Sequence, residues 1–203
     1  GGTGGHIYPA LSIINKIKQR DKNAEILYVG TTNRMEKDII PKYNIPYYAI
    51  KVTGLERKLS INNLKTLKNF IFAVIKMKKK IKEFKPDIVI GVGGYVTAPV
   101  IYAAKICKVK TIIHEQNSVL GVTNRFLSKY VDAVLVSFPD TVVKAKRVVY
   151  TGNPSSEELN IPFSKSELGL SSTKKLVLIV MGSLGSKVIN DRMKEILPKF
   201  SNK

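Results

Sequence analysis

The sequence predicts an α/β protein whose parallel sheet is covered by helices on both faces. Short, continuous apolar runs, such as residues 88–90 and 133–136, alternate with longer segments of helical periodicity. Runs without alternating polarity are typical of strands that are buried on both faces, as in parallel sheets. Glycine-rich segments follow two of these runs, at the point where a strand of this class turns into a helix.

The first part of the chain supplies strands at residues 26–29 and 47–52 and helices at residues 8–20, 35–42 and 64–84. Leu11, Ile14 and Ile17 recur at helical spacing in the first helix. Gly30 ends the first strand. Pro86 ends the third helix, because the residue before a proline disfavours helical geometry.

The same alternation continues with strands at residues 88–90, 111–113, 133–136 and 148–149 and helices at residues 98–106 and 123–130. Serine and proline then become frequent, which indicates a linker and a surface loop. An apolar run at 176–180, a glycine loop and a helix at 187–197 repeat the order of strand, loop and helix. We therefore expect a domain at residues 1–152, a linker at 153–173 and the start of a second, truncated Rossmann-like domain at 174–203.

The chain opens on Gly1-Gly2-Thr3-Gly4-Gly5-His6, directly before the first predicted helix. Small residues at this position allow backbone N–H groups to approach a phosphate or a sugar. In open α/β proteins such a loop follows a buried strand. No strand precedes this one in the sequence, so we expect a fragment that starts just inside its own active-site motif.

The net charge, the cysteine content and the longest uncharged run indicate which classes of protein fit the sequence. The 203 residues include 34 basic and 15 acidic ones, a net charge of +19, which favours binding to nucleic acid or to an anionic membrane surface. A general bias toward lysine codons would also explain the average charge. Cys107, the one cysteine, has no partner for an internal disulfide and is expected to be a small core residue. The longest uncharged run, residues 88–104, is short for a membrane span and contains glycines and a proline.

Polar residues gather at the expected ends of two central strands. Gly93, Gly94 and Tyr95 follow the strand at 88–90, and His114-Glu115-Gln116-Asn117 follows the strand at 111–113. The carboxyl ends of parallel strands are the place where α/β folds bind ligands. Taken singly, the glycine loop could be a structural turn and His114 a hydrogen-bonded core residue, but four adjacent polar side chains favour a site.

These segments together resemble the MurG family of bacterial UDP-N-acetylglucosamine:lipid I N-acetylglucosaminyltransferases. The resemblance rests on the opening glycine motif with Tyr8-Pro9, on Gly93-Gly94-Tyr95-Val96-Thr97-Ala98-Pro99, on His114-Glu115-Gln116-Asn117 with Thr123-Asn124, and on Gly152-Asn153-Pro154. The motifs occur in the order of the family and extend over essentially the whole chain.

The resemblance implies a GT-B fold, in which two Rossmann-like domains face each other across a cleft. The first domain would take lipid I and the second most of the UDP-GlcNAc. By this likeness Thr3, Gly4 and Gly5 reach the donor, Asn117 contacts its sugar and Ser183 contacts the uridine diphosphate. We also expect Gly93, Gly94 and Tyr95 to bind substrate.

Two departures from the family pattern place donor contacts in question. Ser156 stands where the family commonly has an arginine. Met181, Leu184 and Ser186 replace three members of the third glycine loop.

The chemistry of the residues is consistent with an inverting, metal-independent glycosyl transfer. A neutral histidine can take the proton of the attacking acceptor hydroxyl, and His6 is our first choice as that base. Glu115 or His114 could be the base instead, or could orient it. A helix N-terminus would stabilise the leaving UDP without metal, and the sequence has no Asp-x-Asp pair and suggests no cofactor. Because most of the donor domain would be lacking, we expect the chain by itself to be inactive.

Three other classes of protein fit some of these features and not others. A dinucleotide-dependent oxidoreductase should carry an acidic residue at a strand end about 20 residues after the glycine loop, but Gly30-Thr31-Thr32 stands at the end of the strand at 26–29. A nucleic-acid-binding protein would suit the charge but leaves the glycine loops unexplained, so no nucleic acid is expected as a partner. Another GT-B enzyme that acts on lipids, such as a diacylglycerol glycosyltransferase, would differ only in its acceptor groove.

The helix at residues 64–84 combines an apolar stripe with many lysines. Its stripe includes Leu64, Leu67, Ile71 and Val74, and its lysines include Lys78, Lys79 and Lys80. The stripe could simply face the core. The resemblance implies instead a peripheral protein on the cytoplasmic face of the bacterial membrane, docked on anionic lipid through this helix.

Overall fold

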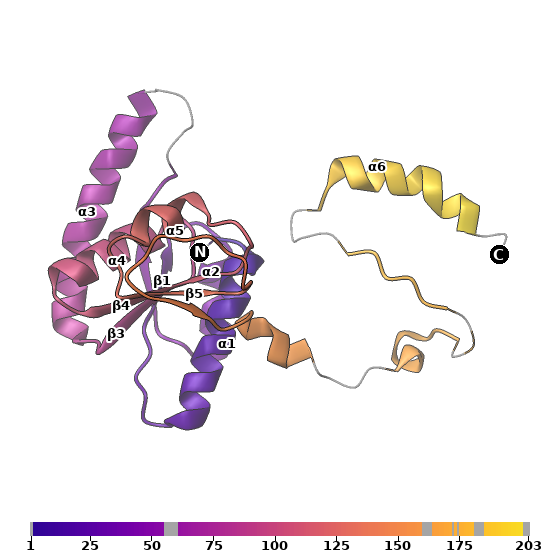
Figure 1. Cartoon of the computed structure of the whole chain (residues 1–203), viewed down its shortest axis with the longest axis horizontal. Coiled ribbons are helices and arrows are strands. Elements are labelled where there is room, and N and C mark those ends of the chain that lie inside the picture. The colour runs from indigo at the N-terminus through magenta and orange to yellow at the C-terminus, as the bar shows by residue number, and fades with distance from the viewer. Residues whose placement is uncertain are drawn as a thin grey trace. The chain divides into compact units, whose positions relative to one another are not determined.

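The computed structural model describes residues 2–54, 61–159, 164–171, 173, 175–180 and 185–200. The chain divides into two units, Gly1–Leu159 and Asn160–Lys203, so the division falls inside the predicted linker. Unit 1 contains all the β-strands of the described residues (Figure 1). Among the described residues no helix has both the length and the apolar character needed to cross a bilayer.

Unit 1 has the predicted α/β order, with six parallel strands in two groups. Strands β1 (Tyr28–Thr31) and β2 (Tyr47–Ile50) pair with each other. Strands β3 (Ile88–Gly91), β4 (Lys110–Glu115), β5 (Ala133–Val136) and β6 (Val148–Tyr150) form a second sheet in that order. In the register of the second sheet Ile90 lies opposite Ile112, and His114 lies opposite Leu135.

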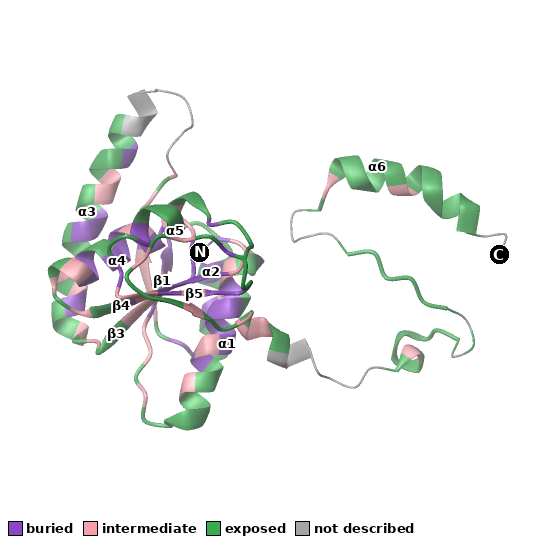
Figure 2. Ribbon diagram, viewed as in Figure 1, coloured by how far each residue is buried: buried purple, intermediate pink, exposed green. Residues whose placement is uncertain are grey.

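Helices cover both faces of these strands. Helix α1 (Gly4–Arg20) packs on Tyr28, whereas α3 (Ile61–Phe84) and α4 (Thr97–Ile106) share a core cluster with Val29. Successive side chains of a strand point to opposite faces, so α1 and the pair α3–α4 lie on opposite sides of β1. Figure 2 shows the buried residues concentrated where these helices meet the strands. Helix α5 (Val122–Leu127) completes a third cluster through Leu127, which joins Ile113 of β4.

Several element boundaries differ from those expected. The first helix begins at Gly4 instead of residue 8, and the segment predicted as one helix at 35–42 is a short α2 (Glu36–Ile39) followed by a 3-10 helix (Ile40–Tyr43). Pro41, in the first turn of that 3-10 helix, lacks the N–H that would continue an α-helix.

The predicted strand at residues 176–180 is wrong. These residues form no strand, and their side chains are exposed, Leu178 to 76%. A strand is stabilised by hydrogen bonds to a neighbour. Within the part of unit 2 that the structure describes there is no other strand for this run to join. Unit 2 contains α6 (Lys187–Ile196), close to its predicted limits, and 3-10 helices at Lys165–Leu168 and Leu197–Phe200.

Two isoleucines of α4 give a matched test of the core. Ile101 is 1% exposed and Ile106 is 45% exposed on the same helix. We expect Ile101→Ala to lower the free energy of unfolding by about 2–5 kcal/mol, because it leaves a cavity among buried side chains. Ile106→Ala should change it by less than about 0.5 kcal/mol. Urea titrations followed by circular dichroism measure both values, and equal losses would contradict the packing of α4.

Candidate active site

The candidate site lies where the carboxyl ends of β3 and β4 meet the N-terminus of α1. His6 comes from the first turn of α1, Gly93 from the loop after β3, and Asn117 from the loop after β4. The carboxyl ends of parallel strands share one edge of a sheet, and this edge is where α/β folds place ligands. Residues that are far apart in the sequence are therefore brought to one edge of unit 1.

The start of α1 fixes the position of His6. Thr3 is extended, with φ −137° and ψ 158°, and its carbonyl oxygen accepts the N–H groups of His6 at 3.0 Å and Ile7 at 3.1 Å. Its hydroxyl oxygen lies 3.1 Å from Nδ1 of His6. Gly4 and Gly5 of the glycine motif thus lie in the first turn of a helix rather than in a loop before it. The first N–H groups of a helix have no intrahelical acceptor, and here they belong to Gly4 and Gly5.

The ring of His6 lies against the backbone of Gly93. A Cβ atom added to Gly93 would lie 2.9 Å from Cδ2 and 3.0 Å from Nε2 of His6, and the φ angle of Gly93 is +92°. Both the space and the backbone conformation therefore require glycine. The Thr97 hydroxyl donates to the Gly93 carbonyl at 2.7 Å, which holds the loop in place. Withdrawal of the ring from water lowers the pKa of His6 to about 4, so His6 is neutral at pH 7.

His114 has both ring nitrogens in hydrogen bonds. It is 1% exposed, its Nε2 lies 3.1 Å from the Gly152 carbonyl oxygen, and Nε2 of Gln116 lies 3.1 Å from its Nδ1. The carbonyl can only accept and the amide nitrogen can only donate, so the ring is neutral with its proton on Nε2. Burial lowers the pKa of His114, although the bond to Gly152 opposes this. The ring thereby ties β4 to the segment after β6.

Glu115 accepts four hydrogen bonds while it is 2% exposed. Its Oε1 accepts from the backbone and side-chain N–H groups of Asn117 at 3.1 and 2.9 Å. Its Oε2 accepts from the Gly121 N–H at 3.0 Å and from Nδ2 of Asn124 at 2.9 Å. Burial by itself would raise the pKa of Glu115, but these bonds outweigh it and leave the pKa below its usual value. Glu115 therefore organises the turn that carries Asn117.

Asn117 and Asn124 share Glu115 but face different surroundings. Asn117 is exposed at the edge of the sheet, where a ligand can reach it. Asn124 is 2% exposed, donates to the His114 carbonyl at 3.1 Å, and its Oδ1 has no hydrogen-bond partner among the described residues. No sequence pattern indicated a role for Asn124, Thr97 or Gly121. The signal for Asn124 was its place in the Thr123-Asn124 motif, but its link to Glu115 depends on the fold.

Of the remaining predicted binding residues, the structure describes Gly94, Tyr95 and Ser156 but not Ser183. Tyr95 is 54% exposed, and its ring lies directly against Gly54, while Gly94 has a φ of +81°. Ser156 is exposed in the 3-10 helix Pro154–Leu159, and its hydroxyl donates to the Asn153 carbonyl at 2.7 Å. Ser183 lies outside the described residues.

The apolar side chains of α3 divide into a buried set and an exposed set. Leu64, Leu67 and Ile71 are 74%, 55% and 51% exposed. Val74 is 8% exposed and belongs to the core cluster with Met77, so its assignment to a membrane surface is corrected. It faces the core because α3 packs on α4 at this level.

A shallow hollow on α3, which we call the α3 patch, is lined by Leu64, Lys65, Leu67, Lys68, Ile71 and Phe72. Phe72, which is 60% exposed, is not among the apolar residues that the sequence predicted for this surface. The predicted lysines lie outside this patch. Lys80 forms an ion pair with Glu83 at 2.8 Å and lies over the Tyr48 ring, whereas the Lys68 ammonium lies 5.9 Å from the centre of the Phe72 ring.

Comparison with protein families finds that residues 1–136 match the model of the glycosyltransferase family 28 N-terminal domain. Two curated relatives are both named UDP-N-acetylglucosamine--N-acetylmuramyl-(pentapeptide) pyrophosphoryl-undecaprenol N-acetylglucosamine transferase. The one from Halalkalibacterium halodurans is 48% identical over 97% of this chain and 56% of its own length. The one from Bacillus cereus, which carries the number 1, is 49% identical over 100% of this chain and 57% of its own length. The chain thus spans a little over half the length of these relatives.

Two solved structures are also similar. The crystal structure of Acinetobacter baumannii MurG matches with a TM-score of 0.72 and 33% identity, over 98% of this chain and 55% of that one. A structure of S. aureus MnaA with UDP matches with a TM-score of 0.55 and 12% identity, over 91% of this chain and 48% of that one. The second likeness concerns the fold alone.

The two histidines of the chain allow a direct titration. We expect the Cε1–H resonances of both to titrate below the usual histidine pKa of about 6.5, that of His6 near 4. Because both rings bind a proton less readily when folded, the stability that they contribute is present above pH ~6.5 and is lost as the pH falls toward 4. His6→Gln assigns the two NMR signals. A His6 pKa near 6.5 would show that its ring is not withdrawn from water.

Proposed function

This chain belongs to glycosyltransferase family 28, and on that basis we propose that the protein transfers N-acetylglucosamine from UDP-GlcNAc to lipid I in peptidoglycan synthesis. The printed names of the relatives support this choice of donor and acceptor. The observation that carries the proposal is the neutral His6 ring, packed on Gly93 in the first turn of α1, at the sheet edge that also presents Asn117.

His6 acts as the general base in this proposal. The acceptor hydroxyl attacks the anomeric carbon of the donor, its proton passes to His6, and the bond from that carbon to the UDP oxygen breaks. In-line attack inverts the anomeric centre. A histidine already in its neutral form at pH 7 can accept the proton, and the hydroxyl of Thr3 beside Nδ1 orients the ring. In this proposal Nδ1 carries the ring hydrogen and donates it to the Thr3 hydroxyl oxygen, so Nε2 is the atom that takes the proton.

The first turn of α1 stabilises negative charge. The N-terminus of a helix carries a partial positive charge, and its backbone N–H groups bind phosphate oxygens without a side chain. Gly4 and Gly5 supply these groups beside His6. The leaving diphosphate is bound here in the proposal, close to the base that acts on the acceptor.

Glu115 and His114 are positioning residues in the proposal. Glu115 already accepts four hydrogen bonds, and both nitrogens of the His114 ring are engaged. A proton from substrate would have to displace one of these bonds. Glu115 holds Asn117 at the exposed edge, where its amide is suited to bind the hydroxyl and acetamido groups of the donor sugar.

The α3 patch docks the protein on the cytoplasmic face of the membrane in the same proposal. It combines four exposed apolar side chains with Lys65 and Lys68 on one stretch of helix. Inserted apolar groups and cations beside anionic lipid favour peripheral binding together, each lysine by about 1 kcal/mol. The lipid-linked acceptor would be reached from this position.

The assignment of the base is tested in the longer protein expected from the relatives. We expect His6→Ala to lower kcat by about 10²–10⁴-fold with lipid I as acceptor, and to remove the acidic limb of the pH profile of kcat/KM. Glu115→Gln should instead raise the KM for UDP-GlcNAc and keep that limb. Asn15→Ala, an exposed change on α1, is the control and should leave turnover unchanged. Transfer to diacylglycerol but not to lipid I would contradict the proposal that lipid I is the acceptor.

Membrane docking is tested by co-sedimentation with vesicles that contain phosphatidylglycerol. We expect Leu67→Ser combined with Ile71→Ser to reduce binding at least ~10-fold, because apolar insertion is lost. Lys65→Glu with Lys68→Glu should reduce it similarly and abolish its salt dependence. Val142→Ser is the control, since Val142 is 90% exposed and lies outside α3. Unchanged binding of both double variants would remove the α3 patch from the docking surface.

A further inference from the structure

A second exposed apolar surface lies on α5 and on the turn that precedes this helix. Its exposed side chains are Val119, Val122, Phe126 and Tyr130, and we call this set the α5 patch. The Phe126 and Tyr130 rings lie together, with their centres 5.4 Å apart. The Tyr130 N–H donates to the Leu127 carbonyl at 2.9 Å, so a helical turn continues beyond the end of α5.

The opposite side of α5 is buried. Leu127 joins Ile113 of β4 in a core cluster, and Asn124 donates to the Glu115 carboxylate at 2.9 Å. A helix that packs on a core needs one apolar side, but α5 has apolar side chains on both sides. Neighbouring apolar side chains that stay in water commonly mark an interaction surface.

The α5 patch begins next to the proposed base. A Cβ atom added to Gly93 would lie 3.0 Å from Nε2 of His6 and 3.7 Å from Nδ2 of Asn124 in α5. Oε2 of Glu115 accepts from Asn124 and also from the Gly121 N–H, which directly precedes α5. The helix is therefore held in place beside the point at which the acceptor hydroxyl would lose its proton.

The charged side chains that accompany the α5 patch are cationic. Between residues 117 and 130 the charged residues are Arg125 and Lys129, and both are exposed. They follow Val122 by three and seven positions, so they lie along the same side of the helix as Val122. An apolar strip bordered by cations matches an amphiphile with an anionic head, and arginine in particular binds phosphate oxygens in pairs.

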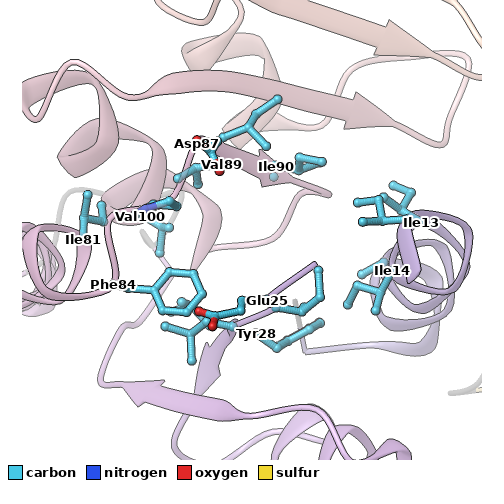
Figure 3. A pocket seen from close by; sticks show the side chains of 18 of the residues that line it. Ile13, Ile14, Glu25, Tyr28, Ile81, Phe84, Asp87, Val89, Ile90 and Val100 are labelled. Carbon is cyan, nitrogen blue, oxygen red and sulfur yellow. The ribbon is translucent and has the colours of Figure 1, made fainter. Parts of the chain in front are cut away.

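The apolar groove between β1 and β3 has a different charge. It has a volume of about 620 Å³, and its lining includes Asp21, Glu25 and Asp87 as well as Lys80 and Lys85. Figure 3 shows Glu25 and Asp87 among the apolar side chains around it. Acidic and basic groups offset each other there, whereas both charged residues of segment 117–130 are cations. Of these two apolar surfaces, the α5 patch suits an anionic lipid better.

We propose that the α5 patch binds the isoprenoid chain of the lipid-linked acceptor and that Arg125 and Lys129 bind its diphosphate. This inference rests on the proposed function. The names of the relatives describe an acceptor in which a pyrophosphoryl group joins the muramyl sugar to undecaprenol. With the attacking hydroxyl at His6, the diphosphate lies one sugar ring away, and the first isoprene units follow it over α5.

Helix α4 lies between the α5 patch and the α3 patch. Ala103 of α4 shares a core cluster with Met77 of α3, and Ile101 of α4 shares another with Leu127 of α5. Tyr102 is exposed on the outer side of α4. A lipid that leaves a bilayer at the α3 patch therefore reaches the site over three neighbouring helices that each expose apolar side chains.

Binding is tested with farnesyl diphosphate, a soluble isoprenoid diphosphate. The chain has no tryptophan, so Phe126→Trp places a single reporter in the α5 patch. We expect a saturable blue shift of its emission. In this background Arg125→Glu with Lys129→Glu should raise the Kd at least ~10-fold, because the bonds from both cations to the diphosphate are lost. Val122→Ser should raise the Kd several-fold, because apolar contact is lost.

The matched control for the charge reversal is Lys18→Glu with Lys22→Glu. Both lysines are exposed at the far end of α1, and the change in net charge is the same. This control should alter the Kd by less than about 2-fold, because salt screens distant charges. A Kd that the Arg125 and Lys129 reversal leaves unchanged, or that both reversals raise equally, would overturn the proposal.

Farnesol and inorganic diphosphate separate the two halves of the ligand. Each should bind at least ~10-fold more weakly than farnesyl diphosphate, because each makes one of the two kinds of contact. Inorganic diphosphate that binds as tightly as farnesyl diphosphate would overturn the assignment of the isoprenoid chain to the α5 patch. Farnesol that binds as tightly would overturn the assignment of the diphosphate to Arg125 and Lys129.

Kinetics in the longer protein expected from the relatives distinguish this inference from the proposed function. Arg125→Glu with Lys129→Glu should raise the KM for lipid I at least ~10-fold and leave the KM for UDP-GlcNAc unchanged. An unchanged KM for lipid I, or weaker vesicle binding with that KM unchanged, would overturn the inference and, in the second case, assign α5 to the bilayer surface. Absence of any transfer to lipid I by the unaltered protein would contradict the proposed function, and the Kd for farnesyl diphosphate would then decide the inference.

Discussion

The contact between the His6 ring and the backbone of Gly93 is the constraint on which the site depends. It joins the first turn of α1 to the loop after β3 and leaves no room for a Cβ atom at position 93. Burial of the ring at this position, together with the nearby positive N-terminus, lowers the pKa of His6 to about 4. A larger residue at position 93 would therefore displace both the N-terminus of α1 and the His6 ring.

A second constraint holds the other half of the site. Glu115 is a buried carboxylate, which is costly unless hydrogen bonds replace water. Four donors from Asn117, Gly121 and Asn124 satisfy it, and in doing so they shape the turn after β4. A carboxylate that already accepts four hydrogen bonds is a poor proton acceptor, but it fixes the conformation of the turn. The proposed roles of His6 as base and Glu115 as positioning residue rest on this difference in hydrogen bonding.

Much of the fold could be predicted from the sequence, because strand runs are local patterns, and the motif positions indicated the strand ends at which the candidate site lies. The start of α1 could not be predicted, because glycines favour a loop. Here Thr3 precedes the helix and the His6 ring packs on Gly93, and both belong to the tertiary structure. The hydrogen bond between His114 and the Gly152 carbonyl could not be predicted either, because the two residues lie 38 positions apart in the sequence. The run at 176–180 has the composition of a strand, but composition does not supply a neighbour to pair with.

Helix α3 shows why one apolar pattern can serve two surfaces. Thr66, Ala73, Val74, Met77 and Ile81 form its buried stripe, and Leu64, Leu67, Ile71 and Ile75 form an exposed stripe beside it. A helix that packs on one neighbour needs only one such stripe. The exposed stripe loses the burial free energy of roughly 25 cal/mol for each Å² of apolar surface that stays in water. This lowers stability and solubility unless a partner covers the stripe. The adjacent Lys65 and Lys68 are the reason for proposing an anionic lipid surface as that partner, because cations beside apolar side chains suit such a surface better than a protein core. The charge of +19 therefore carries information where lysines border the α3 patch, and little where they are scattered singly.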